Sequence, residues 1–160
     1  MLPVIWNAET EFPPAFAGMA TDTNFKDDVT VPCGAAPQPF GTVVASVAAT
    51  GISALPIGTN PIEGVALHDH RFSGRIVGQE GYVQFDAMSV RRRGRVWGLA
   101  SGACTKDAVA KYDPATGAFA DAGTGTLPNA KFLTALIAVP GINGVGSQNI
   151  VLVELGSPAV

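Results

Sequence analysis

Two histidines and two cysteines are the residues of this sequence whose types could bind a metal ion. His68 and His70 stand two positions apart, so on a strand both imidazoles would lie on one face, and Asp69 or Asp86 could add a carboxylate. Zinc takes three or four ligands in a tetrahedral array. The sequence has no further histidine, and Cys33 and Cys104 show no ligand spacing. We therefore expect no metal or cofactor, and two free, buried thiols.

Catalytic motifs are equally weak. The run 141–146 (GINGVG) has the order GxxGxG, and the residues after it are typical of a strand, whereas a phosphate loop needs a helix N-terminus. No GxSxG nucleophile motif occurs. The adjacent carboxylates Asp27 and Asp28 lie in a polar, extended region rather than on strands that could build a pocket. We expect that the protein is not an enzyme.

The strongest charge feature is the run Arg91, Arg92, Arg93, Gly94, Arg95. It has three interpretations: a solvated turn between strands 82–90 and 95–100, a nucleic-acid contact, or a contact with an acidic partner surface through bidentate arginine–carboxylate pairs. The partner surface could belong to another protein or to a neighbouring copy of the chain. Because Gly94 permits a sharp bend, we expect Arg91, Arg92 and Arg93 to point outward together.

Composition limits the class of partner. Only 14% of the 160 residues are charged, against roughly 25% in ordinary soluble domains. The net charge of −3 argues against general nucleic-acid binding, and no apolar stretch approaches the length of a membrane span. We expect neither nucleic acid nor membrane as a partner, but a subunit whose surface is covered by neighbours.

The chain divides in two by composition. Residues 1–41 are rich in proline, which forbids a long helix or a central strand, yet they carry many apolar side chains. We interpret them as an extended N-terminal arm, and residues 42–160 as the β-rich domain. The arm could lie along another surface or wrap its own domain, and we expect contact with other chains. The candidate anchors are Trp6, Phe12, Phe16, Met19 and Phe25.

The domain shows short alternating segments with turn signals between them, and no helical period over three turns. This pattern predicts an all-β fold, an antiparallel β-barrel or sandwich-like domain. A strong turn at 113–117 (DPATG) predicts a hairpin. The expected strands are 42–49, 64–67, 82–90, 94–100, 108–112, 118–120, 131–139 and 149–155.

Six short runs follow one another in a characteristic order over about residues 14–155: 14–23 (PAFAGMATDT), 37–44 (PQPFGTVV), 64–70 (GVALHDH), 90–97 (VRRRGRVW), 112–119 (YDPATGAF) and 128–132 (PNAKF). Their order and spacing resemble those of the structural cement, or capsid decoration, proteins of tailed bacteriophages. The resemblance implies a β-rich domain without catalytic residues that binds the outside of a capsid shell, bridges major capsid protein subunits and stabilises the head.

On this resemblance the expected partners are the major capsid protein and other copies of the chain, as a homotrimer or alternatively a homodimer. The expected location is the capsid exterior of the virion, after synthesis in the host cytoplasm. Two alternatives stay open: a minor head or head–tail structural protein, and a small ligand-binding β-barrel module. The candidate contact residues are the five anchors of the arm together with Arg91, Arg92 and Arg93.

Overall fold

The computed structural model describes residues 15–21, 26–72, 80–140 and 146–156. Eleven strands lie in these ranges: β1 (Asp27–Pro32), β2 (Gln38–Pro39), β3 (Val43–Ser46), β4 (Ser53–Ala54), β5 (Ile62–Ala66), β6 (Gly81–Tyr82), β7 (Ala87–Leu99), β8 (Val109–Tyr112), β9 (Gly125–Phe132), β10 (Ile137–Val139) and β11 (Gln148–Leu155). The described residues contain no helix, and therefore none that could cross a membrane.

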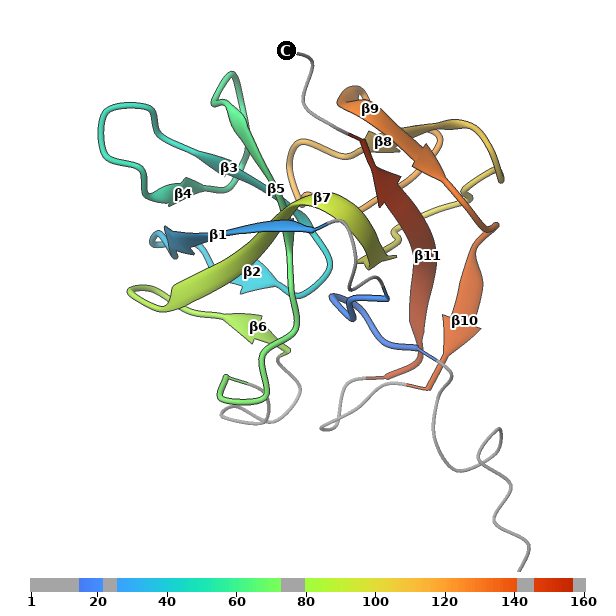
Figure 1. Cartoon of the computed structure of the whole chain (residues 1–160), viewed down its shortest axis with the longest axis horizontal. Coiled ribbons are helices and arrows are strands. Elements are labelled where there is room, and N and C mark those ends of the chain that lie inside the picture. Colours follow the sequence, from blue (N-terminus) through green and yellow to red (C-terminus); the bar gives the residue numbers. More distant parts are fainter. Residues whose placement is uncertain (1–14, 22–25, 73–79, 141–145, 157–160) are drawn as a thin grey trace, which may run out of the picture.

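One curled antiparallel sheet dominates the molecule and forms a half-barrel (Figure 1). Its strand order is β4-β3-β5-β7-β11-β9-β8, with β1 added to β7 and β10 added to β11, while β2 and β6 form a separate pair. The sequence-based prediction of an all-β antiparallel fold is confirmed. The predicted strand 149–155 is β11, and 108–112 contains β8.

Strand β7 is the axis of this sheet. Its first half pairs with β1 and β5, and its second half pairs with β11. Gly94, with φ of +109°, lies where the partners change, and this conformation suits glycine because it has no Cβ. The expectation of two strands separated by an arginine turn is wrong: residues 91–95 lie inside one 13-residue strand. The turn instead falls at residues 83–86, before β7.

Alternation along the central strands supplies two hydrophobic cores on opposite faces. In β3, Val43 joins the larger core and Val44 the smaller one, because successive side chains of a strand point to opposite faces. The larger core holds Phe119 and Phe132, whose rings meet edge-on at 6.0 Å between centroids. The smaller core contains Tyr82, whose hydroxyl donates to the Leu67 carbonyl at 2.7 Å.

The described parts of the N-terminal segment pack on their own chain. Residues 27–32 form β1 along β7, and residues 38–39 form β2. Around Gly18, backbone groups bond to two strands or their ends: the Gly18 N–H donates to Trp97, and its carbonyl accepts from His68. These residues therefore pack on the chain's own domain, and contact of the arm with other chains stays a prediction. Prolines fit here because β1 and β2 are edge strands and Pro32 and Pro39 end them.

Two further expectations need correction. The predicted strand 131–139 is divided between β9 and β10. The predicted turn at 113–117 is present, with the Asp113 N–H donating to Ala118 and the Gly117 N–H donating to Asp113. However, residues 118–120 form only isolated bridges, one of them from Phe119 to Tyr112. The ladder partner of β8 is β9.

Candidate interaction surface

The four arginines of the run differ in burial. Arg91 is buried, at 2% exposed, whereas Arg92, Arg93 and Arg95 are exposed. The expectation that Arg91, Arg92 and Arg93 point outward together is therefore wrong for Arg91. The strand continues through the bend at Gly94 because the ladder to β1 ends at Arg93 and the ladder to β11 begins at Gly94. The register with β1 shifts between Arg91 and Arg93, a β-bulge that leaves both Arg92 and Arg93 exposed.

Arg91 is held by a carboxylate of its own chain. Asp28 lies directly opposite it in the register of β1 and β7. The Arg91 Nε donates to one Asp28 oxygen at 2.8 Å and an Nη to the other at 3.0 Å, while the second Nη donates to the Arg95 carbonyl at 3.0 Å. This bidentate pair fixes β1 to the middle of the sheet. Arg91 is thus a structural residue rather than an exposed contact.

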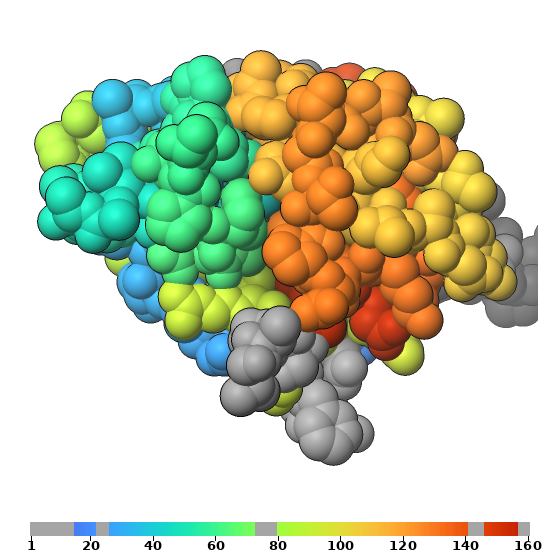
Figure 2. All heavy atoms as spheres, turned by 90° about the horizontal axis from the view of Figure 1, so that it is seen from above, coloured from blue at the N-terminus to red at the C-terminus, as the bar shows by residue number. Residues whose placement is uncertain are grey.

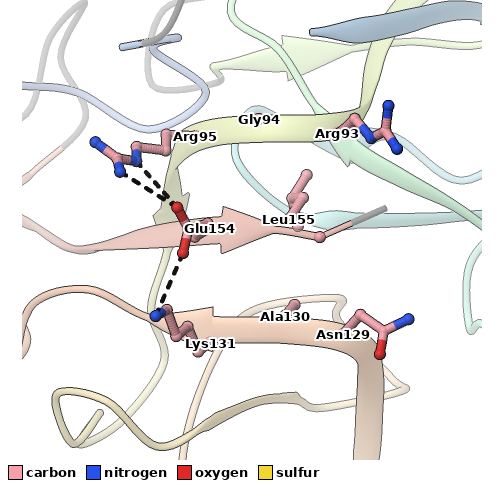
Figure 3. Close-up of a pocket in the computed structure, with 9 residues that line it drawn as sticks. Arg93, Gly94, Arg95, Asn129, Ala130, Lys131, Glu154 and Leu155 are labelled. Atoms are coloured by element: carbon pink, nitrogen blue, oxygen red, sulfur yellow. Dashed lines mark hydrogen bonds and ion pairs between the residues drawn. The ribbon is translucent and has the colours of Figure 1, made fainter. Parts of the chain in front are cut away.

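Arg93 and Arg95 line a hollow of about 430 Å³ between the middle of β7 and the C-terminal parts of β9 and β11 (Figure 3). Arg95 and Lys131 both reach Glu154, at 3.3 Å and 3.5 Å. Arg93 lies farther along the same hollow, opposite Asn129. Among the residues that line the hollow, three carry a positive charge and one, Glu154, carries a negative charge, so the lining is positively charged overall. Such a surface attracts a carboxylate or another anion.

A second hollow, of about 310 Å³, adjoins the first and shares Leu155 and Gly156 with it. Here Arg92 forms an ion pair with Glu63, whose other oxygen accepts from the Ser46 hydroxyl at 2.5 Å. The Ser46 hydrogen bond, and then Arg92, lower the pKa of Glu63. Glu63 is therefore ionised at neutral pH and neutralises Arg92, and Asp27 also lines this hollow, so positive charge is in excess only in the first hollow.

The anchors of the predicted arm are only partly placed. Trp6, Phe12 and Phe25 lie outside the described residues, so their contact with a partner stays a prediction. Phe16 and Met19 are half-buried on the chain itself: the Phe16 ring meets His68 at 4.7 Å between centroids, and Met19 packs beside a small cluster at the start of β11.

His68 is a buried core residue, with its side chain 4% exposed. Its ring packs on Phe40 at 4.6 Å, and its Nε2 lies 3.9 Å from a Glu80 oxygen. Burial lowers the pKa of His68, and the neighbouring His70 adds to this effect against the opposing carboxylates of Glu80 and Asp69. The imidazole is therefore neutral at pH 7.

The other reactive groups are inert. Cys33 and Cys104 are buried and unbridged, and burial raises the pKa of Cys104 to about 11, so its thiolate is scarce at neutral pH. Among the described residues no group of three or more histidine, cysteine or acidic side chains could hold a metal ion.

Sequence reasoning missed Arg95, Lys131 and Glu154 as one cluster. They come from three strands that are far apart in the chain, and only the register of β11 with both β7 and β9 brings them together. Glu154 stands opposite Arg95 on one side and Lys131 on the other. The sequence shows one charged residue in each of three alternating segments, but it does not show which strands pair or in which register.

The chain matches one protein family and is similar in structure to a phage capsid protein. Residues 7–156 match the family model described as "Structural cement protein (E217 gp24/Pam3 gp6)". A search of curated proteins finds no match. Among solved structures, a chain from "The capsid of Myoviridae Phage XM1" is similar with a TM-score of 0.65 and 17% sequence identity, over 89% of this chain and 91% of that one. That likeness concerns the fold.

Proposed function

Because the chain belongs to the family of phage structural cement proteins, we propose that it binds the outer face of the capsid and bridges neighbouring major capsid protein subunits. The family gives the chain a structural role in the virion, with capsid shell proteins as its partners. The contact surface, the exterior position and the oligomeric state are parts of the proposal.

The hollow lined by Arg93, Arg95 and Lys131 is the observation that carries the proposed contact. It lies at the surface of a chain whose net charge is −3, so this local excess of positive charge is distinctive. Glu154 holds two of the cations in a fixed arrangement. A carboxylate from a shell subunit entering the hollow would meet cations that are already positioned, which reduces the entropy lost on binding.

A weak contact of this kind is sufficient for a cement. Exposed ion pairs contribute only about 0–1 kcal/mol each, but a protein that contacts several sites of one shell gains avidity without any new contact. The long, continuously paired strand β7 gives the body stiffness between its contacts. We propose a symmetric homotrimer as the attached form, with a homodimer as the alternative.

The test compares the wild-type protein with two charge-removing variants for binding to shells assembled from the major capsid protein of the same phage. Arg93→Gln removes one positive charge from the hollow, whereas Lys111→Gln removes one from an exposed position on β8. We expect Arg93→Gln to reduce occupancy of the shells, with the largest loss at moderate salt, because salt screens the remaining pairs.

Lys111→Gln should bind like the wild type. If both variants bind like the wild type at low and moderate salt, the hollow is not the contact. If the wild-type protein itself leaves the shells bare, the proposed function is wrong. Analytical ultracentrifugation of the free protein separates trimer from dimer, and the copy number per virion separates a cement, present in many copies, from a minor head or head–tail component.

A further inference from the structure

Three of the five exposed large hydrophobic side chains in the described part of the chain gather at one end of the sheet. Val47 is 37% exposed, Ile52 41% and Phe85 87%. Figures 1 and 2 both place the segments around residues 33–36, 47–52 and 83–86 at that end, remote from β8 and β9. We name Val47, Ile52 and Phe85 the apolar tip.

Hydrogen bonds connect these three segments to one another. The Val47 N–H donates to the Ile52 carbonyl at 2.9 Å, which closes the first loop. The Gly34 N–H donates to the Ser53 hydroxyl at 2.9 Å, and the Phe85 N–H donates to the Cys33 carbonyl at 3.0 Å. The segment 33–36 therefore connects the loop of Ile52 to the turn of Phe85.

Phe85 is held outward by a strained backbone. Its φ is +73°, a left-handed conformation that bulky side chains rarely adopt. The surrounding turn enforces it: the Asp86 N–H donates to the Val83 carbonyl at 3.0 Å, the Val83 N–H donates to the Asp86 carboxylate at 2.8 Å, and the Cys33 N–H donates to the Asp86 carbonyl at 2.8 Å. A phenylalanine here costs stability and leaves a large apolar ring in water, and such strain is typical of functional positions.

The tip is also free of net positive charge and nearly free of charge altogether. The segments 33–38 (CGAAPQ), 47–54 (VAATGISA) and 83–87 (VQFDA) contain one ionisable acid, Asp86, and no lysine or arginine. The Asp86 carboxylate is turned back onto Val83. The chemistry that fits this surface is an apolar pocket, and it differs from the anion that fits the basic hollow.

The size of the tip decides between possible occupants. A buried phenylalanine ring covers about 150–250 Å², and the two smaller side chains add less, whereas a stable complex needs about 800 Å² from each partner. The tip is therefore too small to hold a second copy by itself. It suits a protein that is held by several small contacts at once, as the proposed function requires.

We propose that Phe85 inserts into an apolar pocket of a capsid shell subunit, and that the tip and the basic hollow contact two neighbouring subunits. This inference rests on the proposed function. Strand β7 begins at Ala87 beside the tip and reaches Arg95 in the hollow, a path of roughly 25 Å at about 3.3 Å per residue. Two contacts of different chemistry, held apart by one paired strand, would bridge the seam between subunits.

The test is Phe85→Asn, with Val109→Thr as the control. Asparagine tolerates the left-handed conformation, so this change relieves strain while it removes the ring. Val109 is 55% exposed on β8, away from the tip. We expect Phe85→Asn to weaken binding to assembled shells by about tenfold or more, the loss that follows from burying a phenylalanine side chain, equally at low and moderate salt. Its melting temperature should equal or exceed that of the wild type.

Val109→Thr should bind like the wild type. Wild-type binding by Phe85→Asn would overturn the inference and leave the proposed function intact, whereas bare shells with the wild-type protein would overturn both. A lowered melting temperature would show that Phe85 acts in folding instead. If Phe85→Asn dissociates an oligomer of the free protein in ultracentrifugation, the occupant is a second copy, which also overturns the inference.

Discussion

The pair of Arg91 and Asp28 should be a main contributor to stability, and Asp28→Ala measures it. Breaking a buried ion pair costs about 3–5 kcal/mol, because an uncompensated charge stays in the interior. Arg91 is 2% exposed, but the Asp28 side chain is 28% exposed, so water can reach the vacated space. We therefore expect a smaller loss, about 2–3 kcal/mol, which for a chain of this size lowers the melting temperature by roughly 5–12 °C.

A double-mutant cycle isolates the interaction between the two side chains. Arg91→Met removes the buried charge and keeps much of the volume, so the double variant with Asp28→Ala should be more stable than the sum of the single losses predicts. The control cycle uses Arg92 and Glu63 on the exposed face of the same sheet. We expect about 2 kcal/mol of coupling for the first pair and at most about 1 kcal/mol for the second. Equal coupling in both cycles, measured by urea unfolding, would refute the buried-pair argument.

Two further predictions concern a close backbone approach and the buried histidine. Gly64→Ala should abolish folding or lower the free energy of unfolding by several kcal/mol, since a Cβ there would lie 2.1 Å from the Arg91 carbonyl oxygen. The control Gly146→Ala adds a Cβ that meets nothing within 4 Å, so it should leave the melting temperature nearly unchanged. Equal melting temperatures of the two variants would contradict the described packing. Because the pKa of His68 is lowered on folding, the unfolded chain binds the proton first below about pH 6.5. The free energy of unfolding should therefore be highest above that pH and fall as the pH drops toward 5. In urea titrations at several pH values, His68→Gln should flatten this dependence of the unfolding free energy on pH, whereas the exposed-site control His70→Gln should retain most of it. An unchanged pH dependence in His68→Gln would exclude His68 as its source.

Local signals in the sequence were sufficient where local chemistry decides the structure. The turn 113–117 was predictable because an aspartate, a proline and a glycine supply side-chain and conformational preferences within five residues, and Asp113 does accept from the Ala115 N–H at 2.9 Å. Strand β11 was predictable because its apolar residues alternate toward the core. The all-β class follows from many such segments.

Local sequence patterns gave wrong predictions where pairing with distant strands decides the structure. Four arginines and Gly94 suggested a turn, but pairing with β1, β5 and β11 keeps β7 extended. The inward direction of Arg91 depends on Asp28, 63 residues away. The prolines of the first 41 residues suggested an arm on another surface, whereas two of them, Pro32 and Pro39, end edge strands of the chain's own sheets.

The continuous course of β7 through residues 91–95 explains how one chain can serve two contacts. A loop at residues 91–95 would leave the tip and the basic hollow on independent parts, and a load on one contact would move it relative to the other. The continuous β7 limits that freedom, because its first half is paired with β1 and its second half with β11, so a displacement of either contact must disrupt one of these ladders. The Arg91–Asp28 pair reinforces the ladder close to the bend at Gly94, where a strand with a positive φ is least constrained by its own residues. The buried arginine therefore serves the proposed bridging function without touching the shell: it keeps the distance between the two contacts constant.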